Sequence, residues 1–174
     1  VDALAVRCSF PTWLAARWVA RYGTGEAERL MLAMNERPPL TVRVNTARAT
    51  REEAQRRLLE EDGLRAEPTR YAPEGLVVEH GAPPGRWKTF VAGEVVPQDE
   101  ASILVSRLLA PRPGETVADV CAAPGTKTTH LAALMEGVGR IVAFDPQPQR
   151  LALVDESAAR LGFGLIETRP GPVE

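Results

Sequence analysis

The sequence predicts an α/β fold in which two helices and a small α+β module precede a parallel sheet. Two observations carry this prediction. After residue 115, short β-branched runs alternate with helical patterns in the order βαβαβ, which is one half of a doubly wound sheet. Within this part, Thr116–Thr129 begins as a strand, continues as a loop of small residues and runs directly into a helical pattern. Ligands bind at the carboxyl ends of such strands, so this loop is the predicted binding site.

The N-terminal residues predict two helices. The first covers residues 9–22, begins near Ser9 or Thr12 and ends before Gly23, and Trp13, Leu14 and Trp18 are expected on one face. The second covers residues 24–35, and its apolar residues follow the i, i+3, i+4, i+7 spacing of a buried helix face. These residues are Ala27, Leu30, Met31 and Met34.

The next residues predict an α+β module. Alternation over residues 40–46 indicates a strand, and the capping-box pattern Thr50–Glu53 opens a helix with Ala54, Leu58 and Leu59 inward. The acidic end of this helix, at residues 60–62, is unfavourable for the helix dipole, so fraying is expected there. Further short strands are expected near residues 67–71, 75–78 and 88–91, with a loop at 81–85. Such modules often present a sheet to RNA, but the fold alone does not establish that.

The remaining residues predict the parallel sheet and its helices. Residues 98–110 form an amphipathic pattern whose predicted inward stripe is Ala101, Leu104, Val105, Leu108 and Leu109. Three strands are predicted: the first begins after residue 115, the second covers residues 140–144 and the third covers residues 165–168. A helix is expected over residues 146–161. We therefore expect three parts: an N-terminal helical segment (1–37), a small α+β domain of RNA-binding type (38–95) and a partial Rossmann-like domain (96–174).

Composition limits the possible functions. Apolar content of 44% and charged content of 25% are those of a globular protein, and no apolar run approaches the roughly 20 residues that cross a membrane. Residues 1–60 carry a net charge of +3 and residues 61–174 carry −5, which permits a polyanion near the N-terminal part. Cys8 and Cys121 are far apart, and His80 and His130 are isolated from other ligand-type residues. We therefore expect a cytoplasmic protein with no disulfide, metal site or signal peptide.

Three ligands compete for the loop. A phosphate-binding P-loop requires a Gly where Val120 stands and a Lys directly after Gly125, where Thr126 stands instead. A dinucleotide fingerprint requires three glycines, whereas the loop has only Gly125. A nucleoside without phosphate fits better. Asp145 ends the next strand, where an acidic residue hydrogen-bonds ribose hydroxyls, and an acidic neighbourhood with Asp119 suits a sulfonium. The loop thus favours S-adenosylmethionine, although both aspartates could simply cap helices.

The loop sequence resembles that of the Fmu/Sun (Nop2/Sun) family of RNA cytosine-5 methyltransferases. Asp119–Ala132 matches the family's cofactor motif nearly throughout, and Thr126 stands where the family usually has a second Gly. Further segments in family order support the resemblance: Ser9–Leu14, Arg43–Thr46, Val96–Ser102, and Asp145 with Arg150. The resemblance covers essentially the whole chain.

The resemblance implies an S-adenosylmethionine-dependent methyltransferase fold, of which the first βαβαβ part is present, and an RNA substrate, expected to be ribosomal. It implies that Asp145 holds the ribose, that Arg150 lies beside the site, and that Arg43 and Asn45 lie near RNA. The residues implied to wrap the methionine part are Cys121, Ala122, Ala123, Pro124, Gly125, Thr126 and Lys127.

Methylation of cytosine C5 requires a thiolate that adds to C6 and a base that removes the C5 proton. In the family, two cysteines and an aspartate in later motifs do this work, beyond the third strand. We therefore expect no catalytic residue in this chain, neither Cys121, which belongs to the cofactor loop, nor Cys8. The expectation is a fragment of a full enzyme, because the sheet is unfinished; the alternative is a shortened, non-catalytic module that binds RNA or the cofactor.

Overall fold

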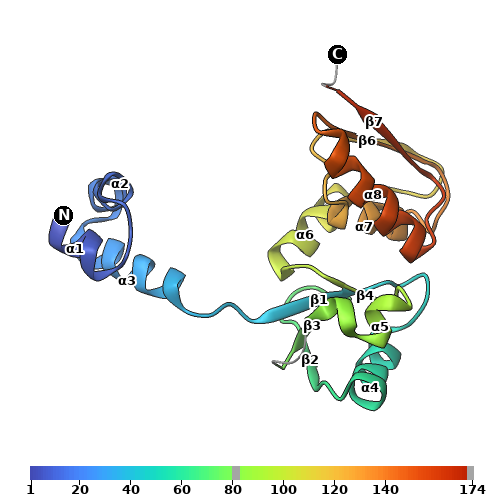
Figure 1. Cartoon of the computed structure of the whole chain (residues 1–174), viewed down its shortest axis with the longest axis horizontal. Helices are drawn as coiled ribbons and strands as arrows, with labels where there is room; N and C mark the ends of the chain where they lie inside the picture. Colours follow the sequence, from blue (N-terminus) through green and yellow to red (C-terminus); the bar gives the residue numbers. More distant parts are fainter. Residues whose placement is uncertain (80–82, 172–174) are drawn as a thin grey trace. The chain divides into compact units, whose positions relative to one another are not determined.

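The computed structural model describes residues 1–79 and 83–171 and divides into two compact units, Val1–Pro38 and Pro39–Glu174. Figure 1 shows the elements of both units. His80 and the first two residues of the loop expected at 81–85 lie outside the described residues. None of the described helices combines the length and the apolar character that are needed to span a membrane.

The first unit contains three helices around a small core. They are α1 (Asp2–Arg7), α2 (Thr12–Tyr22) and α3 (Thr24–Asn35). The two expected helices are confirmed, whereas α1 was not predicted. The expected buried face of the second expected helix, α3, is partly wrong, because Met34 is 56% exposed. The buried core residues are Leu4, Ala5, Cys8, Ala15, Ala27 and Met31.

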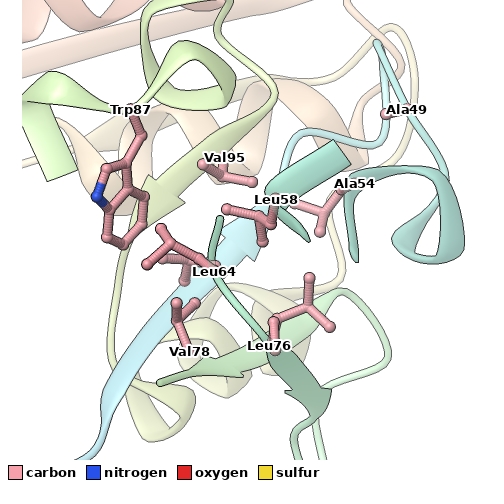
Figure 2. Packing of buried hydrophobic residues seen from close by; sticks show 11 residues of the cluster. Ala49, Ala54, Leu58, Leu64, Leu76, Val78, Trp87 and Val95 are labelled. Atoms are coloured by element: carbon pink, nitrogen blue, oxygen red, sulfur yellow. The ribbon is translucent and has the colours of Figure 1, made fainter. Parts of the chain in front are cut away.

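The described residues of the second unit form two sheets, of which the first has four antiparallel strands in the order β2-β3-β1-β4. The strands are β1 (Leu40–Val44), β2 (Ala66–Pro68), β3 (Gly75–Val78) and β4 (Val95–Pro97). The helical elements are α4 (Arg51–Asp62), the 3₁₀ turn η1 (Pro84–Arg86) and α5 (Lys88–Val91). Val42, Val44 and Leu76 belong to the core of this sheet together with Leu58 of α4, and Figure 2 shows part of this packing.

The capping box of α4 is confirmed. The Thr50 hydroxyl accepts a hydrogen bond from the Glu53 amide at 3.2 Å, and the Glu53 carboxylate accepts one from the Thr50 amide at 2.8 Å. Ala54 and Leu58 are buried as expected, but Leu59 is 52% exposed, which contradicts its expected inward position.

The strand expected at 88–91 is wrong, because these residues form helix α5. The Asp62 carboxylate accepts hydrogen bonds from the Lys88 amide at 2.6 Å and from the Thr89 amide and hydroxyl at 3.2 and 2.6 Å. It thus satisfies amides of the first turn, which have no partner within the helix. The expected fraying of α4 is also wrong, since α4 continues to Asp62 and ends at Gly63 in the left-handed conformation.

The second sheet is parallel, in the order β5-β6-β7, and confirms the βαβαβ prediction. Its strands are β5 (Thr116–Asp119), β6 (Arg140–Asp145) and β7 (Ile166–Pro170). Its helices are α6 (Glu100–Leu109), α7 (Thr126–Leu134) and α8 (Pro148–Leu161). Asp119 pairs in register with Ala143, so the loops that follow β5 and β6 leave the same edge of the sheet.

The stripe expected to face inward on α6 is largely exposed. Leu108 is 88% exposed, Leu109 58% and Val105 53%, whereas the fully buried positions of α6 are Ile103 and Ser106. Within the described residues, β5 pairs with β6 alone and is therefore an edge strand. Periodicity identified the apolar stripe, but it could not show whether the stripe is covered.

The two sheets share buried residues. In β4, Val95 belongs to the core of the first sheet, and its neighbour Val96 belongs to a core of the second. On β1, Thr41 and Arg43 point away from the core of Val42 and Val44, yet they are only 7% and 1% exposed. Both faces of β1 are therefore buried, and this strand presents no open sheet face to RNA.

Candidate functional site

The loop between β5 and α7 is held by the carboxylate of Asp119. One carboxylate oxygen accepts a hydrogen bond from the Cys121 amide at 3.3 Å, and the other accepts one from the Thr128 hydroxyl at 2.7 Å. Asp119 therefore ties the start of the loop to the first turn of α7. Asp119 does not cap α7, because its partners are a loop amide and a side-chain hydroxyl, and α7 begins without a side-chain cap.

Small residues allow the loop to pack against its neighbours. The Ala122 amide donates to the Phe144 carbonyl at 2.9 Å, and the Gly125 amide donates to the Ala122 carbonyl at 2.8 Å. Gly125 has a φ of 99°, and a Cβ at this position would lie 3.1 Å from the Cα of Val154. Because this contact is with backbone on α8, only glycine fits without a shift.

Asp145 ends β6 at the same edge, and its side chain is buried. One carboxylate oxygen accepts a hydrogen bond from the Gln147 amide at 3.0 Å, and the other lies 3.4 Å from Nη1 of Arg150. Arg150 also donates through Nη2 to the Ala123 carbonyl at 3.2 Å. It therefore connects Asp145 to the loop, which places the predicted Asp145, Arg150 and loop residues together.

A hollow of about 500 Å³ adjoins the loop on the side of the edge strand β5. Asp119, Val120 and Lys127 line it together with exposed apolar residues of α6. The backbone of Ala122, Ala123 and Gly125 carries no side chain larger than a methyl group, and Cys121 is exposed. The exposed residues Val120 and Cys121, beside the Asp119 carboxylate at the end of β5, leave room for a nucleoside cofactor, whereas Ala122, Ala123 and Asp145 are buried.

A buried charged cluster lies at the middle of α7, around His130. Glu74 accepts from Nε of Arg107 at 2.9 and 2.7 Å, and Nε2 of His130 lies 2.8 Å from Glu74 Oε1. Burial works to raise the pKa of Glu74, but the hydrogen bonds from His130 and Arg107 outweigh it and lower the pKa to about 2. Burial lowers the pKa of His130, against the effect of Glu74. A neutral His130 therefore donates its Nε2–H to Glu74, and its buried Nδ1 has no described partner.

The two residues expected near RNA are buried and bound to protein. Arg43 is 1% exposed and donates to the Thr126 carbonyl and the Thr129 hydroxyl, both at 3.2 Å. Asn45 is also 1% exposed and donates to the carbonyls of Gly93 and Leu161 at 2.9 and 3.1 Å. Neither side chain presents a surface to RNA, so the geometry contradicts the expected contact and indicates a role between the sheets.

Comparison with known protein families identifies the family of this chain. Residues 10–83 match the RsmF/B-like methyltransferase ferredoxin-like domain, and residues 106–169 match the family 16S rRNA methyltransferase RsmB/F. The chain belongs to the Fmu/Sun family of rRNA methyltransferases. The family expected from the loop motif is thus confirmed.

Similar proteins extend over nearly the whole chain. The probable ribosomal RNA small subunit methyltransferase B of Bacillus subtilis (strain 168) is 37% identical over 166 residues, which cover 95% of this chain and 37% of that protein. The solved methyltransferase homolog protein of Pyrococcus horikoshii has 30% identity and a TM-score of 0.85, over 98% of this chain and 55% of its own. The solved NSun6 of Pyrococcus horikoshii with SFG has 21% identity and a TM-score of 0.85, over 92% of this chain and 65% of its own. This Fmu/Sun chain therefore spans about a third of the length of the curated relative.

Sequence reasoning missed several residues that support the site of this Fmu/Sun member. Thr128 and Thr129 directly follow the loop, and a pair of hydroxyls in a first helical turn was a signal that could have found them. Glu74 carried no local signal, since its partners Arg107 and His130 are 33 and 56 residues away. His130 has no ligand-type neighbour in the sequence, yet it is buried and contacts the distant carboxylate of Glu74.

Proposed function

We propose that this chain supplies the cofactor-binding part of an enzyme that uses S-adenosylmethionine to methylate C5 of cytosine in ribosomal RNA. One observation carries the proposal: Asp145, buried at the end of β6, is joined through Arg150 to the small-residue loop that follows β5. A carboxylate at this position of a parallel sheet is suited to ribose hydroxyls. The family and its rRNA methyltransferase relatives support the same reaction.

In this proposal, Cys121 through Lys127 hold the methionine part of the cofactor, and Asp145 binds the ribose. Arg150 acts on Asp145 and Ala123 as a positioning residue. The bound cofactor supplies an activated methyl group. The solved NSun6 relative contains SFG, an analogue of S-adenosylmethionine, which supports the choice of cofactor.

We assign the attack on the base to neither cysteine of this chain. Cys8 is 1% exposed within the helical unit, and Cys121 lies in the proposed cofactor loop. Residues 1–174 by themselves are therefore expected to bind the cofactor without methylating RNA. Transfer of labelled methyl groups to RNA by this chain would show that one of its own residues provides the nucleophile.

The RNA partner is proposed to contact the chain outside β1, whose two faces are covered. We retain the functional division into residues 1–37, 38–95 and 96–174 as part of the proposal, with β4 (Val95–Pro97) crossing the second boundary.

The first helical unit offers a surface for the RNA. The exposed arginines of α2, Arg17 and Arg21, lie on a helix without acidic residues and suit a polyanion.

Calorimetric titration with S-adenosylhomocysteine tests the cofactor assignment. The unmodified chain should bind, and Asp145→Asn, which removes the charge at nearly constant shape, should weaken binding about tenfold, as expected for a lost charge-assisted hydrogen bond. The control is Asp155→Asn, because Asp155 lies on helix α8, which follows β6, and accepts a hydrogen bond from the Thr168 hydroxyl at an exposed position. Equal affinity of the folded unmodified and Asp145→Asn proteins would contradict the proposal.

A further inference from the structure

The buried arginine of β1 reaches the far end of the candidate cofactor loop. Arg43 lies in the centre of the four-stranded sheet, paired with Gly75 on one side and Val96 on the other. Its side chain leaves the face opposite to Val42 and Val44, toward α7. A long side chain anchored in a hydrogen-bonded strand is a rigid support for whatever its end contacts.

The guanidinium contacts two acceptors in the first turn of α7. Nη1 donates to the Thr126 carbonyl and Nη2 to the Thr129 hydroxyl, both at 3.2 Å. The Thr129 hydroxyl in turn lies 2.8 Å from the Gly125 carbonyl, which it can reach as a donor. The chain of contacts therefore runs from β1 through Thr129 to the glycine of the loop.

No carboxylate of the described residues forms a direct ion pair with Arg43. Burial lowers the pKa of Arg43 to about 9, against the attraction of Glu74, so the side chain is a cation at neutral pH. Among the described residues, the Glu74 oxygens bind Arg107 and His130, and Nε of Arg43 is buried without a partner. Burying such a cation has a free-energy cost, and the start of a helix dipole repels it. Stability alone therefore does not explain why an arginine occupies this position.

We propose that Arg43 is a positioning residue that holds the loop Cys121–Lys127 in its ligand-binding conformation, so that the first sheet sets the cofactor affinity of the second. The role requires two donors at fixed separation, which a planar guanidinium supplies and a lysine ammonium does not. The link to cofactor affinity rests on the proposed function, whereas the positioning of the loop does not.

The test compares Arg43→Met with Arg160→Met. Arg160 joins α8 to α5 by donating to the Phe90 carbonyl at 2.8 Å, so its replacement also removes a cation and a hydrogen bond between the same two parts of the unit. Hydrogen–deuterium exchange of the peptide 122–129 is measured without ligand, and the affinity for S-adenosylhomocysteine is measured by calorimetry. Both are done at a temperature where the variants are folded.

Arg43→Met should speed exchange of this peptide and weaken S-adenosylhomocysteine binding, each by about tenfold, while Arg160→Met changes either by less than about twofold. Arg43→Lys should fall between the unmodified chain and Arg43→Met. If the unmodified chain does not bind S-adenosylhomocysteine, the proposed function fails and the exchange comparison alone decides the role of Arg43. Unchanged exchange in folded Arg43→Met would overturn the proposal.

A second variant covers the case in which Arg43→Met does not fold. Thr129→Val has nearly the same shape and removes the hydroxyl that connects Arg43 to Gly125. It should speed exchange of the peptide 122–129 in the same way. Exchange at the unmodified rate in Thr129→Val would contradict the proposed chain of contacts.

Discussion

The two sheets of the second unit differ in how their apolar residues are covered. In the four-stranded sheet, both faces of β1 are buried, by the core of Val42 and Val44 on one side and by contacts with the parallel part on the other. In the three-stranded sheet, β6 is buried, but the edge strand β5 lies beside a largely exposed α6. Apolar residues with the same periodic spacing therefore contribute differently to the free energy of unfolding: strongly in the four-stranded sheet, where they are buried, and weakly on α6, where they are exposed.

The largest expected effect compares Leu76→Ala in the first sheet with Leu108→Ala on α6. Leu76 is fully buried in the core shown in Figure 2, so its truncation should lower the free energy of unfolding by about 2–5 kcal/mol. Leu108 is 88% exposed, so its truncation should change the free energy of unfolding by less than about 0.5 kcal/mol. Urea unfolding measures both. Similar losses in the two variants would show that the exposed face of α6 is covered in solution.

An intermediate effect concerns the charged cluster that joins the sheets. The pKa of Glu74 is lowered from 4.5 to about 2, so its contribution to stability is present above pH 4.5 and is lost as the pH falls toward 2. The lowered pKa of His130 acts in the same direction below its ordinary value of 6.5, because the unfolded chain takes up the proton first. We expect Glu74 to contribute about 2 kcal/mol, less than the full shift implies, because the partly exposed Arg107 is screened by solvent.

Glu74→Gln tests this contribution, because glutamine keeps the shape and does not titrate. The difference in unfolding free energy between the unmodified and variant proteins should be constant above pH 6.5, where neither Glu74 nor His130 titrates, and should shrink between pH 4.5 and 2 as Glu74 is protonated. Urea unfolding at several pH values measures it. A difference that does not change over this range would place the acid-sensitive groups elsewhere.

The smallest expected effect compares two glycines beside the parallel sheet. Gly125 and Gly137 both have positive φ, of 99° and 73°, but a Cβ at Gly125 would meet the Val154 backbone at 3.1 Å, whereas one at Gly137 would meet nothing within 4 Å. Both alanine variants carry the conformational cost of positive φ, about 1 kcal/mol. Gly125→Ala should cost about 1 kcal/mol more, since loop or helix must shift. Equal thermal stability of the two variants would mean that the loop moves freely away from α8.

Local patterns predicted the fold wherever local forces decide it. The Thr50 capping box, the β-branched run of β6 and the small-residue loop after β5 all depend on neighbouring residues, and all three elements formed as expected. The failures have distant causes. Residues 88–91 contain apolar and β-branched residues that suit a strand, but the carboxylate of Asp62, 26 residues earlier, starts a helix there.

In the candidate site, too, residues fixed by local sequence were predicted, whereas residues fixed by distant contacts were not. The residues from Cys121 to Lys127 are contiguous, so their shared environment could be read from the motif, and Asp145 follows from the spacing of parallel strands. The supporting contacts of Arg43 join residues 83 and 86 positions apart, and Glu74 meets His130 across 56. Sequence distance of this kind carries no periodic signal, so the true surroundings of Arg43 and Asn45 required the three-dimensional structure.

The burial of both faces of β1 limits how this protein can be recombined with others. A ferredoxin-like module from another source would fill the space of residues 39–97, but its central strand would have to offer a guanidinium where Arg43 stands. A module with an aliphatic residue there would leave the Thr126 carbonyl and the Thr129 hydroxyl without that donor. In chimeric enzymes, the compatible exchange unit is therefore the module together with the first turn of α7, and not the module alone.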